Sequence, residues 1–108
     1  MMPPPRFRVV LSGVMEAKVD RWAAWADARG VREDFDKALN TLLFRLAYEA
    51  DEWGKRENVS DMAGPVAEIR NGVVMMLAVR YGIARPQGLV FVTGLRWRDD
   101  YPGGRPPA

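Results

Sequence analysis

The sequence predicts a two-layer α+β domain in which two helices cover one face of an antiparallel sheet, in the order β-α-α-β-β-β. Three observations predict this fold. One apolar stretch alternates near the N-terminus, two later stretches have apolar residues at helical spacing, and three final apolar stretches are separated by turn signals. Because each helix has a single apolar stripe to bury, both are expected on the same sheet face, which leaves the other face open.

The first strand and first helix are predicted in the N-terminal third. Residues 6–12, RFRVVLS, alternate in part and are rich in strand-forming side chains. A helix is then expected to begin at Ser12 or Gly13 and to continue to about Arg29, because Gly30 is a typical C-terminal stop. Its apolar stripe consists of Val14, Val19, Trp22, Trp25 and Ala26.

The second helix has the clearest pattern in the chain. Acidic residues at positions 33, 34 and 36 lie in its first turn, where they stabilise the helix dipole, and Gly54 ends it. Apolar residues at this spacing favour packing in the core over binding of a cofactor. The stripe consists of Phe35, Leu39, Leu42, Leu43, Leu46, Ala50 and Trp53.

The rest of the chain predicts strands after a polar stretch at residues 55–64. Asn71–Gly72 is a strong signal for a two-residue hairpin turn, which would place Arg70 opposite Val73 on one face. Alternation puts Arg80 and Tyr81 on opposite faces, so that only one of them belongs to the open face. The predicted strands are residues 66–71, 73–83 and 89–97, with a second turn at residues 84–88.

Length and composition narrow the possible functions. The 108 residues fit one domain, with irregular Pro-rich tails at about residues 1–5 and 102–108. Absence of Cys and His excludes disulfides, thiolate catalysis, a His-dependent triad and the common zinc sites, so neither a metal nor a cofactor is expected. No apolar run approaches the roughly 20 residues that span a bilayer, and no signal peptide is evident, so we expect a cytoplasmic protein without a membrane partner.

Positive charge in the C-terminal part is carried by arginine alone. Residues 66–108 contain six Arg, no Lys and three acidic residues, within a chain of net charge +2. The planar guanidinium suits phosphate, which favours a nucleic-acid partner. A solvated basic face on a small protein explains the charge alone equally well.

Four segments in order resemble the RelE/ParE superfamily of bacterial toxin–antitoxin toxins. They are KALNTLLFRLAYEADEWG at residues 37–54, GPVAEIR at 64–70, LAVRY at 77–81 and VFVTGLRWR at 90–98, and the resemblance spans about Phe7 to Tyr101. It implies a helical hairpin packed on an antiparallel sheet, and a toxin held inactive by a cognate antitoxin. RelE-like members cut mRNA on the ribosome without a metal, whereas ParE-like members inhibit DNA gyrase without cleavage. A non-toxic interaction module of the same fold is the third possibility.

The resemblance also implies a catalytic set of Arg70, Arg98 and Tyr101. Arg70 matches the arginine that ends the family's second strand and is expected to contact phosphate, although an exposed arginine before a turn explains it as well. Arg98 belongs to the basic segment after the last strand. Tyr101 is expected to stack on a base or to move a proton, and its alternative is a simple tail residue.

Three further residues are expected to bind RNA, namely Arg80, Arg96 and Tyr81. Tyr81 matches the family's strand tyrosine, which is more often a packing residue than a catalyst. The sequence departs from the family at Ala78, where many members carry arginine, and it contains no His. These departures keep the gyrase-inhibitor reading open. An open face with exposed apolar side chains would fit antitoxin docking.

Overall fold

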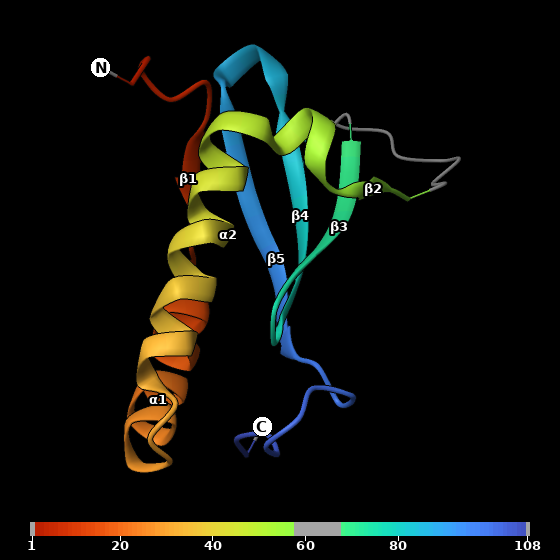
Figure 1. Cartoon of the computed structure of the whole chain (residues 1–108). Helices are drawn as coiled ribbons and strands as arrows, with labels where there is room; N and C mark the ends of the chain where they lie inside the picture. The colour runs from red at the N-terminus through yellow and green to blue at the C-terminus, as the bar shows by residue number, and fades with distance from the viewer. Residues whose placement is uncertain (1, 58–67, 108) are drawn as a thin grey trace.

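The structure of the chain is a computed structural model that describes residues 2–57 and 68–107 (Figure 1). Two helices pack on one face of a five-stranded mixed sheet, which confirms the predicted two-layer α+β architecture. Residues 64–67, which belong to the GPVAEIR motif and in part to a predicted strand, lie outside the described residues. The elements are β1 (Arg8–Val10), α1 (Gly13–Ala28), α2 (Arg32–Trp53), β2 (Lys55–Arg56), β3 (Glu68–Val74), β4 (Leu77–Ala84), a 3-10 turn (Arg85–Gln87) and β5 (Leu89–Trp97).

The strands lie in the order β1-β5-β4-β3-β2. All neighbours are antiparallel except β1, which pairs in parallel with β5. The prediction of a purely antiparallel sheet is therefore wrong at this edge. A parallel neighbour needs a long connection, and the chain supplies one because both helices and three strands come between β1 and β5.

The β3–β4 turn lies at Met75–Met76, so the predicted turn at Asn71–Gly72 is wrong. Gly72 is inside β3, opposite Val79, and Met75 has the positive φ of 52° that the turn needs. Gly72 instead allows the Trp53 side chain to pack closely against the backbone of β3. A Cβ there would lie 2.3 Å from the Trp53 ring, so only glycine lets the end of α2 rest on β3.

Helix α1 begins and ends within one residue of the prediction. The Ser12 side chain accepts a hydrogen bond from the Met15 amide at 3.2 Å, which caps the first turn. Gly30 adopts a φ of 73° after the last turn. Trp22 and Ala26 are buried as expected, whereas Val14 of the predicted stripe is 71% exposed.

Helix α2 ends at Trp53 before Gly54, as the sequence predicts. It contacts β1, β3, β4 and β5 and therefore supplies the main apolar cover of the sheet (Figure 1). Its stripe is confirmed at its centre, where Leu42, Leu46 and Ala50 are buried. Leu39 and Leu43 are only half-buried, because α1 and the sheet together cover a narrower strip of the helix than the pattern suggests.

The C-terminal residues 98–107 contain no helix or strand but fold back beyond the β3–β4 turn (Figure 1). The Arg98 amide donates to the Met76 carbonyl at 2.8 Å, Arg105 forms an ion pair with Asp99, and Pro106 is buried. Among the described residues, no helix is both long and apolar enough to cross a membrane.

Candidate functional site

The sheet register decides between Arg80 and Tyr81. Tyr81 points to the helix-covered face and is fully buried. Its hydroxyl donates to the Ala50 carbonyl at 2.7 Å and accepts from the Gly54 amide at 3.1 Å. Burial raises the pKa of this hydroxyl above its ordinary value. Tyr81 thus hydrogen-bonds backbone groups at the C-terminal end of α2. Its burial disagrees with the expected contact with RNA.

Arg70 lies on the same covered face, opposite Tyr81, and its side chain is only 17% exposed. Its guanidinium donates to the Glu68 carboxylate and to the Gly54 carbonyl. Glu68 also accepts from Arg85 at 2.8 Å. Although burial opposes the charge on Glu68, hydrogen bonds from Arg70 and Arg85 hold its pKa below the ordinary value. The phosphate contact expected of Arg70 would have to compete with these partners.

The ion pairs continue from Arg85 to the end of α2. Arg85 contacts Asp51 at 3.3 Å, and Arg6 binds the same carboxylate through two hydrogen bonds of 2.7 and 2.9 Å. The Arg6 guanidinium holds the pKa of Asp51 below its ordinary value. These charges join the N-terminal segment, α2, β3 and the 3-10 turn, which indicates a structural role.

Arg98 and Tyr101 lie near the β3–β4 turn, away from Arg70. Arg98 donates to the Met75 carbonyl at 2.9 Å and to the Asp100 carboxylate at 3.0 Å, which lowers the pKa of Asp100. Tyr101 is half-buried and lines a cavity of about 370 Å³ with Trp25 and other residues. The structure therefore does not bring the predicted catalytic residues together.

The open face of the sheet carries a groove of about 710 Å³. Lys55 of β2, Arg80 of β4 and Arg96 of β5 line it, and its far end reaches Lys18 of α1. Arg80 pairs with Gly94 while Arg96 pairs with Ala78, so the two arginines are diagonal neighbours on one face. Such neighbours lie about 7–8 Å apart. Of the predicted RNA-binding residues, the structure thus brings Arg80 and Arg96 together.

Sequence reasoning missed Glu57, which contacts two residues that line this groove. Its carboxylate accepts from Arg80 Nε at 2.8 Å and from Asn71 Nδ2 at 2.8 Å. These two hydrogen bonds hold the pKa of Glu57 below its ordinary value, and the bond from Arg80 has the larger effect. Arg80 also contacts Thr93 at 3.3 Å. The partners are far apart in sequence, so no local pattern marks Glu57.

Thr93 is the extra residue where the register of β4 and β5 shifts, between Arg80 and Tyr81. The bulge turns Thr93 toward Arg80, whose carbonyl accepts from the Thr93 hydroxyl at 3.1 Å. The Thr93–Gly94 pair after the apolar run of residues 89–92 is the one sequence signal for this irregularity.

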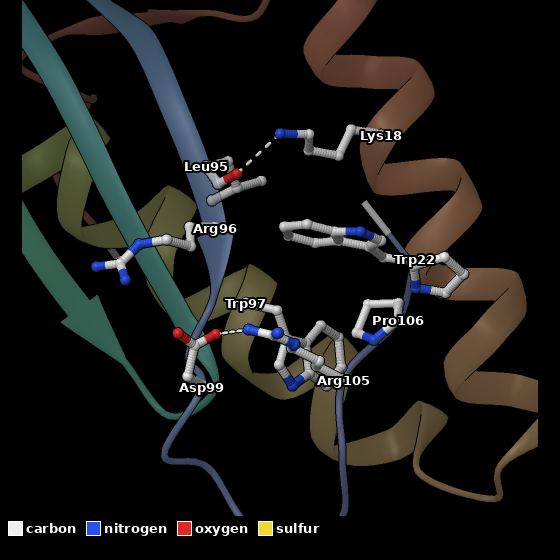
Figure 2. Close-up of a pocket in the computed structure, with 9 residues that line it drawn as sticks. Lys18, Trp22, Leu95, Arg96, Trp97, Asp99, Arg105 and Pro106 are labelled. Atoms are coloured by element: carbon white, nitrogen blue, oxygen red, sulfur yellow. Dashed lines mark hydrogen bonds and ion pairs between the residues drawn. The ribbon is translucent and has the colours of Figure 1, made fainter.

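A second hollow of about 720 Å³ lies between β5 and α1 (Figure 2). Strand β1 pairs with β5 only as far as Phe91, so the rest of that edge faces α1. Lys18 reaches across and donates to the Leu95 carbonyl at 3.1 Å, with its ammonium group 5.6 Å from the Trp22 ring centre (Figure 2). Arg96, Asp99 and Arg105 line the same hollow.

The described residues contain no group of three or more side chains suited to holding a metal ion. In comparisons with protein-family models, curated proteins and solved structures, none matches this chain. The RelE/ParE relationship therefore stays a prediction from the four sequence segments.

Proposed function

We propose that this chain is a RelE-like toxin that cleaves mRNA on the ribosome in the cytoplasm and is held inactive by a cognate antitoxin. The observation that carries the proposal is the groove on the open face, which Lys55, Arg80 and Arg96 line and where Arg80 is hydrogen-bonded to the Glu57 carboxylate. Cations that can meet a phosphodiester beside a carboxylate that can accept a proton form a suitable set for cleavage through a 2′-hydroxyl.

Each step of that cleavage has a candidate group. Glu57 accepts the proton of the 2′-hydroxyl, and the 2′-oxygen attacks the adjacent phosphorus. Arg80 and Arg96 stabilise the charge of the five-coordinate phosphate. Lys55 donates a proton to the 5′-oxygen as the P–O5′ bond breaks. The products are a 2′,3′-cyclic phosphate and a 5′-hydroxyl, and the route needs no metal or cofactor.

The Arg80–Glu57 pair gives this mechanism a built-in activation. In the free protein, Arg80 lowers the pKa of Glu57, which keeps the carboxylate ionised but makes it a weak base. A phosphate that draws Arg80 away removes part of this effect, so the pKa of Glu57 rises toward its ordinary value as substrate binds. Glu57 then becomes a stronger base where the 2′-hydroxyl lies.

This site replaces the catalytic set expected from the resemblance. Arg70 and Arg98 bind the protein's own carboxylates and carbonyls with side chains only 17% and 32% exposed, whereas Arg80 is 46% exposed beside Glu57. Tyr101 lies in the cavity near the turn. The antitoxin is expected to cover part of the open face, where Val73 is 54% exposed beside the cationic groove.

The proposal is tested by inducing the chain alone and mapping the 5′ ends of cellular transcripts. Growth arrest with new transcript ends is expected, and Glu57→Gln should reduce cleavage by about 10²-fold or more because it removes the base. Arg80→Gln should also reduce cleavage, whereas Glu52→Gln, an exposed change outside the groove, should not. Full cleavage by Glu57→Gln would reject this site, and loss of cleavage only in Arg98→Ala would restore the original set.

Inhibition of DNA gyrase without catalysis is the second candidate function. It is favoured by the absence of His and by the engagement of Arg70 and Arg98 in internal bonds. It predicts blocked supercoiling and DNA damage while transcripts stay intact. A chain that causes no growth arrest at all would instead be a non-toxic interaction module.

A further inference from the structure

The hollow between β5 and α1 is continuous with the groove on the open face. Lys18, Leu95 and Arg96 line both spaces, so the two spaces meet at the C-terminal half of β5. In Figure 2, Lys18 reaches β5 from α1 while Arg96 extends away from α1. A flexible chain that crosses the sheet can therefore pass from Arg80 over Arg96 to Lys18 without leaving a cationic surface.

The hollow has the polarity of a site for anions. Lys18, Arg96 and Arg105 line it with one carboxylate, Asp99, which is paired with Arg105. The charges of Arg105 and Asp99 offset one another, so the remaining formal charge along the hollow is positive, which suits a ligand rich in anionic oxygens.

Lys18 is held in place more firmly than an ordinary surface lysine. Its ammonium group donates to the Leu95 carbonyl and lies over the Trp22 ring, yet that carbonyl carries no charge that would neutralise it. An ammonium group has three donors, so further N–H groups are available to a ligand. The side chain therefore presents a positioned positive charge beside β5.

We infer that this hollow is a second subsite for the nucleic-acid backbone, which binds phosphates of a single strand beyond Arg80 and Glu57. The inference rests on the proposed function and adds the direction in which the strand leaves the cleavage site. It assigns Lys18 a direct contact with phosphate. It predicts that Asp99 weakens binding, because its carboxylate repels an anionic chain and forms an ion pair with Arg105.

The test is equilibrium binding of fluorescent oligouridylates of 4 and 12 nucleotides, with 2′-O-methyl groups so that cleavage cannot occur. The 12-mer should bind more tightly than the 4-mer. The slope of log K against log salt is negative, and Lys18→Gln should reduce its magnitude by about 0.7 for the 12-mer, as for one lost phosphate contact on a single strand. The 4-mer should lose less, because it can bind around Arg80 without reaching Lys18. Asp99→Asn should tighten 12-mer binding.

Two controls separate the subsite from general charge effects. Lys37→Gln makes the same change in net charge on the exposed part of α2 and should leave both oligonucleotides unaffected. An oligoglutamate of matching charge should bind more weakly than the 12-mer. Equal binding of that peptide would show a general anionic-peptide surface and would overturn the assignment to a phosphodiester chain.

Failure of the subsite differs from failure of the proposed function. If Arg80→Gln weakens binding of both lengths while Lys18→Gln and Asp99→Asn change nothing, the subsite is rejected and the groove on the open face stands. If the unmodified protein binds neither length at low salt, both inferences are rejected together.

Discussion

The Tyr81 hydroxyl offers the sharpest test of how the sheet register works. Replacement by Phe keeps the ring, which stacks on Trp53 at 6.1 Å, and removes one oxygen atom. That oxygen accepts from the Gly54 amide and donates to the Ala50 carbonyl, and both bonds are buried. An unsatisfied buried polar group costs about 1–3 kcal/mol, and we expect a loss of about 2 kcal/mol.

This loss is large enough to measure by thermal and urea unfolding. With an unfolding entropy of about 2.1 cal/mol/K per residue, about 2 kcal/mol lowers the Tm of a chain of this size by about 9 °C. In urea, the midpoint should fall while the slope m stays unchanged, because the same surface is exposed on unfolding. RNA binding should be unchanged below the Tm, since Tyr81 does not reach the open face.

Tyr48→Phe is the matched control. Tyr48 is half-buried and stacks on Phe44 at 4.8 Å, and its hydroxyl makes no hydrogen bond to the other described residues. It should lose little stability. The reasoning is refuted if Tyr81→Phe costs no more than Tyr48→Phe, or if it abolishes RNA binding while the protein stays folded.

The same hydroxyl predicts a dependence on alkaline pH. Burial raises the folded-state pKa of Tyr81 above the ordinary value of 10.0, so its neutral form is favoured in the fold. Its contribution to stability is complete below pH 10.0 and is lost as the pH rises through the folded-state pKa. The stability advantage over Tyr81→Phe should therefore shrink above about pH 10, and an advantage that stays constant to pH 12 would contradict this assignment.

Two further predictions concern close packing and buried charge. Gly72→Ala should lower the free energy of unfolding by about 1–3 kcal/mol, because the added methyl group overpacks against Trp53. The loss should be much smaller in a Trp53→Ala background. An equal loss in both backgrounds would indicate a backbone role for this glycine instead. Glu68→Gln should cost about 2–3 kcal/mol near neutral pH, because it removes charged hydrogen bonds, whereas Glu52→Gln should change little. The pKa of Glu68 is lowered in the fold, so the stability advantage of the unmodified protein over Glu68→Gln is present above the ordinary pKa of 4.5. This advantage is lost as the pH falls through the folded-state pKa, and acid unfolding curves can measure the loss.

Local chemistry in the sequence was sufficient for the helices and the layer arrangement. Ser12 and Gly30 mark the ends of α1, and Gly54 follows α2, because caps and stops act on neighbouring backbone groups. The spacing of Leu42, Leu46 and Ala50 identified the buried face of α2, since this period follows directly from helix geometry. The strands after them were also found from apolar runs, apart from the two-residue β2.

Contacts between distant residues decided what the local patterns left open. Asn71–Gly72 has the composition of a turn, but Gly72 is needed beneath Trp53, and a steric requirement from another element leaves no mark on the neighbouring sequence. Parallel pairing of β1 with β5 was hidden for the same reason, because the partners lie far apart along the chain.

The candidate site shows the same division between sequence and structure. The sequence by itself determined that arginine supplies the positive charge of the last third, and that Arg80 and Tyr81 must face opposite ways. Only the tertiary structure decided that Tyr81 is buried, that Arg80 is paired with Glu57 on the open face, and that Arg70 is paired on the covered face. The physical reason is that the exposure and the partners of a charge depend on its neighbours in space, which the register of the sheet selects.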